Sequence, residues 1–190
     1  SSDLSIFTRL STNFIIDENN IHFEKEIGSG KYGKVYKGSF QNITTVAIKE
    51  YIKDQDNGKE QFEIFLEEAK LMCAIPSHPN LVLLLGICIS ATKKTIFIVT
   101  EFINNGSLLD FLQSSNLLDT LSLVKIALCI VRGMHHLSIH SIIHNDLAAR
   151  NVLIEAKIYG DSMEYIAKVA DFGLARSLNC PKDAADPNLT

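Results

Sequence analysis

The first residues in the sequence whose spacing could do chemistry form a glycine-rich run, Gly28-Ser29-Gly30-Lys31-Tyr32-Gly33. The run fits G-x-G-x-x-G, a pattern that lets backbone amides approach a phosphate closely. In a dinucleotide-binding site such glycines open a helix, whereas here apolar and polar residues alternate before the run and again through Lys34–Lys37, as in two strands. The pattern therefore predicts a hairpin that either binds phosphate or is a glycine turn without a ligand, and by itself it leaves both open.

Lys49 lies near the end of a second strand-like run, Thr44–Tyr51. The two-residue period of a strand puts Val46 and Ile48 on one face and Ala47 and Lys49 on the other. A small residue beside a lysine could admit a flat base while the ammonium reaches phosphate oxygens, although a lone lysine at a strand end is ordinarily just solvated. A buried acidic partner would favour the first interpretation.

The segment Lys59–Ile75 has helical spacing and offers such an acid. A solvent stripe recurs at intervals of three and four residues: Glu60, Glu63, Glu67 and Lys70. The apolar stripe consists of Ile64, Leu71, Met72 and Ile75. Glu68 lies inside the apolar stripe, and a carboxylate on a buried face needs a cationic partner. We therefore predict that Glu68, and not Glu67, pairs with Lys49.

Four motifs follow one another along the chain in a particular order. Val35 extends the glycine run to G-x-G-x-x-G-x-V, and Val46-Ala47-Ile48-Lys49 matches V-A-I-K. His144-Asn145-Asp146-Leu147-Ala148-Ala149-Arg150-Asn151 is similar to H-R-D-L-x-x-x-N, and Asp171-Phe172-Gly173 is D-F-G. In this order the motifs resemble those of a protein kinase catalytic domain from Ile21 to about Thr190. The resemblance implies an α+β, two-lobed fold with an antiparallel-sheet N-lobe that carries one regulatory helix, the first part of a mainly helical C-lobe, and ATP in the cleft between the lobes.

The resemblance also implies a role for each chemically capable side chain. Asp146 would accept the proton of the substrate hydroxyl, while Asn151 and Asp171 would bind Mg²⁺ or Mn²⁺. Lys49, paired with Glu68, would orient the phosphates of ATP beneath the glycine run.

The adenine site is implied in the same way. Val35 and Ala47 would cover one side of the base and Leu153 the other. Thr100 would be the gatekeeper, and the hinge Glu101-Phe102-Ile103 would hydrogen-bond adenine through its backbone. All of these residues also fit plain core packing, and only the hinge backbone must contact the ligand.

The substrate class is indicated by Ala148-Ala149-Arg150, which resembles tyrosine kinases, since serine/threonine kinases usually carry lysine at the position of Ala148. Arg150 would contact the substrate hydroxyl or the γ-phosphate. The predicted function of the intact protein is phosphoryl transfer from Mg-ATP to a protein hydroxyl, that of tyrosine in the first place. A serine/threonine-specific tyrosine-kinase-like enzyme and a nucleotide-binding pseudokinase scaffold are the alternatives.

The sequence departs from the family pattern in three places. Asn145 replaces an arginine that pairs with a phosphorylated activation-loop residue, and no tyrosine follows Asp171, so we hypothesise that control does not depend on such a pair. The Glu155–Tyr165 stretch is long and predicts an enlarged surface hairpin. The chain stops before an A-P-E motif, so the isolated polypeptide is expected to fold poorly, to expose apolar surface on the Leu121–Leu137 helix, and to phosphorylate nothing.

The elements that must position these residues divide the chain. Strands are predicted from Ile21, over 34–37, 44–51, 81–89, 95–100, 152–154 and 166–169, and helices over 59–75, 107–113 and 121–137, the last mostly buried because its polar stripe is narrow. Residues 1–20 are expected to be a leader or linker, 21–103 the N-lobe, and 104–190 a partial C-lobe with the catalytic loop and the start of the activation segment.

Composition limits the remaining possibilities. The 190 residues are 46% hydrophobic, enough for one sizeable core or two small ones, and a net charge of −4 argues against non-specific nucleic-acid binding. Four scattered cysteines are expected to be reduced, and neither a signal peptide nor a membrane span is expected in this chain, which predicts a cytoplasmic setting. The expected partners are ATP and a protein that presents a tyrosine, or a serine or threonine, hydroxyl.

Overall fold

The computed structural model describes residues 14–30, 33–51, 58–90, 95–114, 118–160 and 162–178, and contacts divide the chain into two compact units. The first unit comprises residues up to Ser77 together with Leu83–Phe102. The second comprises His78–Val82 and the chain from Ile103 onward. Strands dominate the first unit, and the two α-helices that follow Phe102 belong to the second unit. The predicted α+β class is therefore confirmed.

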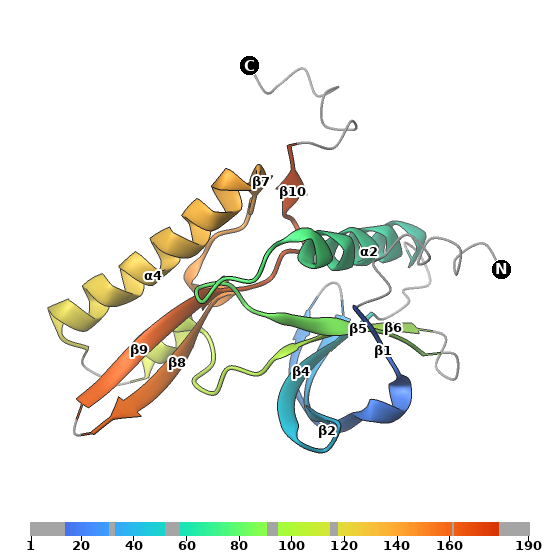
Figure 1. The fold of residues 1–190 in the computed structure, drawn as a ribbon, viewed down its shortest axis with the longest axis horizontal. Helices are drawn as coiled ribbons and strands as arrows, with labels where there is room; N and C mark the ends of the chain where they lie inside the picture. Colours follow the sequence, from blue (N-terminus) through green and yellow to red (C-terminus); the bar gives the residue numbers. More distant parts are fainter. Residues whose placement is uncertain are drawn as a thin grey trace. The chain divides into compact units, whose positions relative to one another are not determined.

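The first unit contains a curved six-stranded sheet and one helix (Figure 1). The strands are β1 (Ile15–Ile16), β2 (Ile21–Gly30), β3 (Gly33–Phe40), β4 (Thr44–Glu50), β5 (Leu84–Ser90) and β6 (Thr95–Glu101). Their order in the sheet is β1-β5-β6-β4-β3-β2, and every neighbouring pair is antiparallel except β1 with β5. The predicted strands of this half are therefore confirmed within one or two residues at most ends.

Strand β1 corrects the prediction that residues 1–20 form a leader. Ile16 is buried and pairs with Cys88 of β5, and a 3-10 turn, η2 (Glu18–Asn20), leads into β2. Gly86 makes room for this segment, because a Cβ at that position would lie 2.6 Å from the carbonyl oxygen of Phe14. A two-residue strand is too short to show a periodic pattern, so the sequence did not reveal it. Residues 1–13 lie outside the described residues.

Alternation along β4 is as predicted, and it builds the core of the first unit. Val46 and Ile48 are fully buried, while Ala47 and Lys49 on the opposite face are half-buried. The apolar cluster contains Ile16, Ile21, Val46, Ile48, Cys88, Phe97 and Val99. Strict alternation from Ile21 would put Ile27 on the buried side of β2, but Ile27 is 43% exposed, because irregularities in the β2–β3 register reverse that alternation.

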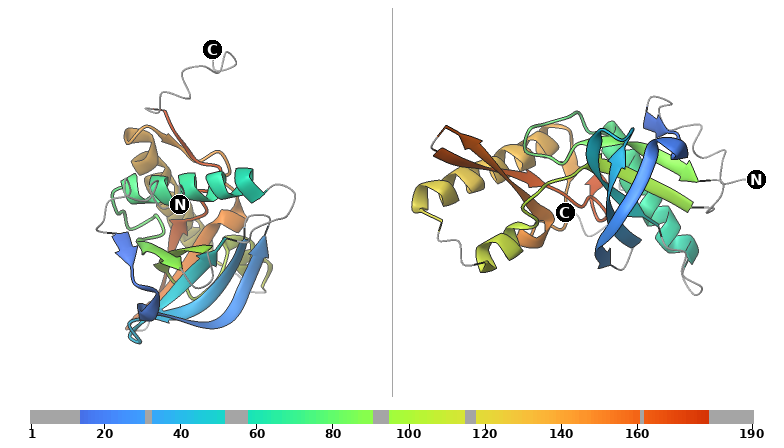
Figure 2. Two further views of the ribbon diagram at one scale, coloured as in Figure 1. Left: turned by 90° about the vertical axis from the view of Figure 1, so that its right-hand side faces the viewer. Right: turned by 90° about the horizontal axis from the view of Figure 1, so that it is seen from below.

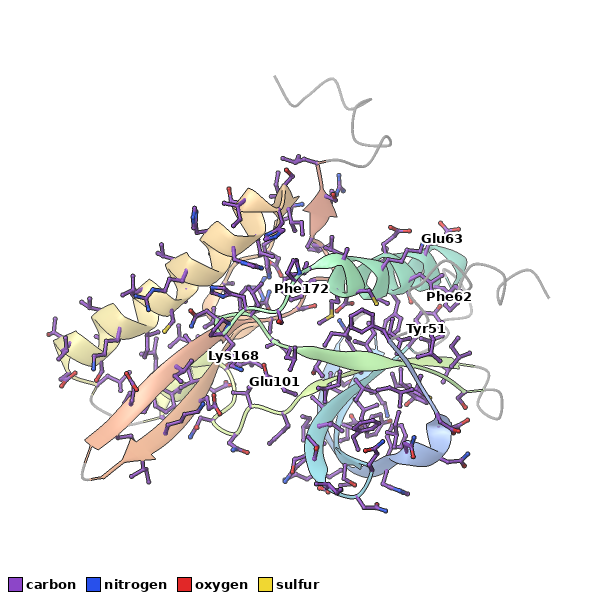
Figure 3. The ribbon with its side chains drawn as sticks, in the orientation of Figure 1. Tyr51, Phe62, Glu63, Glu101, Lys168 and Phe172 are labelled. Carbon is purple, nitrogen blue, oxygen red and sulfur yellow. The ribbon has the colours of Figure 1, made fainter. Side chains whose placement is uncertain are left out.

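Helix α2 (Gly58–Ala74) buries a face that differs in part from the predicted stripe. Its most buried apolar residues are Phe65, Leu66, Ala69 and Met72, whereas Ile64 and Leu71 lie half-buried at the edge. Tyr51, just after β4, packs edge-on against Phe62 and also contacts Phe65, and Glu63 points away from this contact (Figure 3). These aromatic contacts hold α2 against the strand that carries Lys49.

The second unit combines two helices with two small sheets. The helices are α3 (Leu108–Gln113) and α4 (Thr120–Ile139), the hairpin is β8 (Val152–Tyr159) with β9 (Ser162–Val169), and β7 (Ile142–Ile143) pairs with β10 (Arg176–Ser177). Ser107 caps α3, and its side-chain oxygen accepts from the Asp110 amide at 3.1 Å. The hairpin runs beside α4 (Figures 1 and 2), and the core between them includes Ile126, Ile154 and Ala167.

Helix α4 is not the mostly buried helix that its narrow polar stripe predicted. Only Ile126, Gly133 and Leu137 are buried, and its exposed apolar side chains include Leu121, Val124 and Val131. The described elements cover one face of α4 and leave apolar side chains exposed on the other, which agrees with the separate expectation that this helix exposes apolar surface. By length and composition this helix could cross a membrane, a test that core helices of soluble proteins also pass.

The enlarged surface hairpin predicted over Glu155–Tyr165 is present. Strands β8 and β9 stay paired from Val152 with Val169 out to Tyr159 with Ser162. Gly160 turns the chain with φ +59°, and Asp161 lies outside the described residues.

Candidate active site

The predicted ion pair between Lys49 and Glu68 is present in the first unit. The Nζ atom of Lys49 lies 2.7 Å from both carboxylate oxygens of Glu68. The Glu68 side chain is 4% exposed and that of Lys49 20%. Glu67 is exposed and pairs with Lys70 on the helix surface. The choice of Glu68 from the apolar stripe is therefore confirmed.

Sheet register gathers four of the predicted site residues on one face. Lys49 on β4 pairs with Val35 on β3, and Ala47 pairs with Thr100 on β6. Paired residues in a sheet point to the same side, as do residues two apart in a strand. Val35, Ala47, Lys49 and Thr100 therefore form one continuous surface beside the ion pair.

The glycine run forms a strand-to-strand hairpin, as predicted. Gly28 pairs with Val35, and Gly30 pairs with Gly33. Gly33 has φ +152°, and a Cβ there would overlap the carbonyl oxygen of Glu50 on β4, so only glycine fits. Ser29 is exposed within β2, and the predicted ligand Lys31 lies outside the described residues. A helix does not follow the glycines, which excludes the dinucleotide-binding arrangement.

The predicted hinge begins at the end of β6. The backbone amide of Glu101 donates to the Leu83 carbonyl at 3.0 Å, and the Glu101 carboxylate accepts from the Leu83 amide at 2.8 Å. The ammonium of Lys37 lies 5.3 Å from the centre of the Phe102 ring. Ile103, which belongs to the second unit, is buried. Because the Glu101 amide is already used, adenine recognition would have to use other backbone groups, and the hinge role stays a prediction.

The catalytic-loop residues come together in the second unit. Asp146 accepts a hydrogen bond from Nη2 of Arg150 at 2.5 Å, and the side-chain amide of Asn151 donates at 2.8 Å both to the Asp146 carboxylate and to its carbonyl. The Arg150 and then the Asn151 hydrogen bonds hold the pKa of Asp146 below its usual value. The loop therefore presents an ionised carboxylate in a fixed orientation, which is the state that a proton acceptor needs.

His144 joins this loop to the D-F-G segment through a hydrogen bond that sequence reasoning missed. Its side chain is 1% exposed, and the ring packs against Phe172 with centroids 5.4 Å apart. Nδ1 accepts from the Asp146 amide at 3.3 Å, and Nε2 donates to the Ala170 carbonyl at 3.1 Å. Burial lowers the pKa of His144, which favours the neutral ring that can both accept and donate. His144 directly follows the short strand β7, and its sequence surroundings carry no signal for a bond to a residue 26 positions away.

The donors around Asn151 and Asp171 fit a divalent metal. The Asn151 amide nitrogen is committed to Asp146, which leaves the carboxamide oxygen as its ligand atom. Asp171 is exposed, and the amide of Ala170 beside it donates to the Asn151 carbonyl at 2.8 Å. Oxygen donors suit Mg²⁺ and Mn²⁺ and would leave coordination positions for phosphate. Within the described residues no cluster of three His, Cys, Asp or Glu side chains suggests another metal.

Leu153 lies in β8 directly after the catalytic loop, and its side chain is half-buried. It forms a bridge with Ser107 at the start of α3, so its backbone is fixed. Its predicted place below adenine stays a prediction.

Comparison with known proteins agrees with this set of features. The family described as protein tyrosine and serine/threonine kinase matches residues 21–188. The chain is 40% identical over 167 residues to tyrosine protein-kinase src-1 of Caenorhabditis elegans, 87% of this chain and 30% of that protein. It is 41% identical to tyrosine-protein kinase Abl of Drosophila melanogaster, over 83% of this chain and 9% of that protein. It is 40% identical to human tyrosine-protein kinase TXK, over 85% of this chain and 28% of that protein.

Two features define the class of protein: a sheet with a lysine–glutamate pair, and a loop that brings aspartate, arginine and asparagine together. The chain belongs to the protein tyrosine and serine/threonine kinase family. Membership implies ATP and a divalent metal as its small-molecule ligands. The chain spans less than half the length of the curated relatives that it matches.

Proposed function

We propose that the protein containing this chain transfers the γ-phosphoryl group of ATP to a tyrosine hydroxyl of a protein substrate. The observation that carries the proposal is the Asp146 carboxylate, kept ionised and oriented by Arg150 and Asn151 while 28% of its side chain stays exposed. Such a carboxylate can accept a proton from an incoming hydroxyl. The presence of arginine at position 150, and relatives named tyrosine kinases at about 40% identity, favour tyrosine over serine or threonine.

The first unit contributes the groups that hold the nucleotide. Lys49, fixed by Glu68, would pair with phosphate oxygens, and the backbone of Gly28–Gly33 would cover them. The face formed by Val35, Ala47 and Thr100 carries small or mainly apolar side chains, which suit one side of a purine. In this proposal residues 21–103 act as the N-lobe and 104–190 as part of the C-lobe.

The second unit contributes the base and the metal ligands. Asn151 and Asp171 would bind Mg²⁺ or Mn²⁺. A bound ion would neutralise the negative charge on the phosphates while that charge moves onto the leaving group. Arg150, while holding Asp146, would also lie next to the incoming hydroxyl. Catalysis would then rest mainly on positioning and charge stabilisation.

The cellular setting that we propose is the cytoplasm. ATP is abundant there, and Cys73, Cys88 and Cys129 are free thiols in the described part of the chain. Burial raises the pKa of Cys73 and of Cys88 to about 11, which suits inert packing residues.

The test compares the full-length protein with its Asp146→Asn variant in phosphate transfer from ATP. Two peptides identical except for tyrosine or serine at one position serve as acceptors. We expect transfer to tyrosine, and a loss of about 10²–10⁴-fold in kcat in the variant, the usual contribution of a general base. An Asp110→Asn variant, altered at an exposed position in α3, should keep wild-type activity. Nucleotide binding without transfer by the wild type would identify a pseudokinase, and preference for the serine peptide would reject tyrosine specificity.

A further inference from the structure

Two adjacent residues of the catalytic loop hold the D-F-G segment on both of its sides. Nε2 of His144 donates to the carbonyl of Ala170, the residue before Asp171, at 3.1 Å. The side-chain amide of Asn145 donates to the carbonyl of Leu174, the residue after Gly173, at 3.0 Å. The two carbonyls that flank Asp171-Phe172-Gly173 are therefore both fixed to one short stretch of loop.

The clamped segment contains a backbone conformation that needs support. Asp171 has φ +62°, in the left-handed region that side-chain-bearing residues adopt at a cost. Just beyond the segment, Arg176 of β10 pairs with Ile143 of β7, the residue directly before His144. The strand pairing and the two side-chain bonds thus act on the same few residues.

The presence of asparagine at position 145 has two possible physical reasons. Asn145 itself has φ +61°, and asparagine tolerates this conformation better than most residues. Its side chain, however, does not bond its own neighbourhood, as asparagine often does in a turn, but a carbonyl 29 residues away. The backbone reason and the side-chain reason can be separated by substitution, since glycine and aspartate also tolerate a positive φ.

We propose that Asn145 is a positioning residue for metal binding: with His144 it clamps the Asp171-Phe172-Gly173 turn and so holds Asp171 ready for the divalent ion. This inference rests on the proposed function, in which Asp171 is a metal ligand. The Asn145 bond joins an uncharged amide to an uncharged carbonyl, so the clamp needs no phosphate group to form. Through the Asn145 bond this loop holds the segment after Gly173, although position 145 carries no arginine.

The test measures binding of ATP with Mn²⁺ to the full-length protein, with free Mn²⁺ followed by electron paramagnetic resonance. Asn145→Gly keeps the backbone conformation and removes the donor, and Asn145→Asp keeps the shape but puts an oxygen where the amide was. We expect both variants to need about three- to tenfold more Mn²⁺ for half-saturation, the range that loss of one hydrogen bond supports. If asparagine serves only the backbone, both variants will bind Mn²⁺ like the wild type, and the proposal is wrong. A change in one variant but not the other also overturns it.

A matched control comes from the turn between β3 and β4, where Asn42 is exposed and has φ +58°. Asn42→Gly and Asn42→Asp should leave Mn²⁺ binding unchanged, and any loss there equal to that at Asn145 would contradict the proposal. Failure of this proposal can be distinguished from failure of the proposed function. Absence of phosphate transfer with intact Mn²⁺-dependent ATP binding removes the function and keeps the clamp, whereas a wild type that shows no Mn²⁺-dependent binding removes the clamp.

Discussion

Replacing Lys49 by methionine tests whether the Lys49–Glu68 pair is a coupled, buried interaction that holds helix α2. Both oxygens of Glu68 accept from Lys49 at 2.7 Å, and the glutamate is 4% exposed. Removing one partner of a buried pair costs about 3–5 kcal/mol. Because the lysine side chain is 20% exposed, water can reach part of the vacated space, and we expect roughly 2–4 kcal/mol by the same reasoning.

The assay is hydrogen exchange of α2 amides in the full-length protein, since local opening of the helix reports this energy directly. Lys49→Met should speed exchange about 30- to 700-fold, at about 1.4 kcal/mol for each factor of ten. The double variant Lys49→Met with Glu68→Leu removes both charges and should recover most of the protection. Two results would refute the coupling. One is unchanged exchange in Lys49→Met, and the other is a double variant whose loss of protection, as a free energy, equals the sum of the losses in Lys49→Met and Glu68→Leu.

Three further outcomes are expected. Gly33→Ala should destabilise the β2–β3 hairpin and weaken ATP binding, because its Cβ would overlap the carbonyl of Glu50; the melting temperature and ATP titration check this. The low pKa of Asp146 keeps it charged well into acid, so Arg150→Met, which removes the largest cause of that shift, should move the acid limb of kcat/KM to higher pH. Burial lowers the pKa of His78, and His136 and Arg132 lower it further, so docking of the His78–Val82 loop is fully stable above about pH 6.5 and weakens as pH falls. The check is the protection factor of the amides in this loop, which is the intrinsic exchange rate at each pH divided by the observed rate, and it should lose this pH dependence in a His78→Gln variant.

The sequence predicted the side chains of the candidate site better than it predicted their surroundings. Glu68 could be chosen over Glu67 because burial follows helical spacing, and the structure gives 4% exposure for Glu68 and a surface position for Glu67. Strand alternation put Ala47 on the face of Lys49, but Val35 and Thr100 could be assigned to the site only by family resemblance. The register that places them on one face came from pairing between β3, β4 and β6.

Errors arose where a local pattern depends on what packs against it. The apolar face of α4 looks alike whether or not a neighbour covers it, so its narrow polar stripe predicted burial that the described elements do not provide. Alternation did not predict the exposure of Ile27, because irregularities in the pairing of β2 with β3 change which residues face the core. A two-residue sequence period carries no information about such irregularities. Strand β1 was missed because its stability comes from pairing with β5 and not from its own two residues.

What the sequence by itself determined is the set of reactive groups and the elements that carry them, because strand and helix periods, glycine spacing and motif order are local properties of the chain. Only the tertiary structure decided that Lys49 meets both oxygens of Glu68, that Arg150 and Asn151 keep Asp146 ionised, and that His144 and Asn145 hold the D-F-G segment. Most of these bonds join residues between 19 and 29 positions apart, so they form only when folding brings distant segments together.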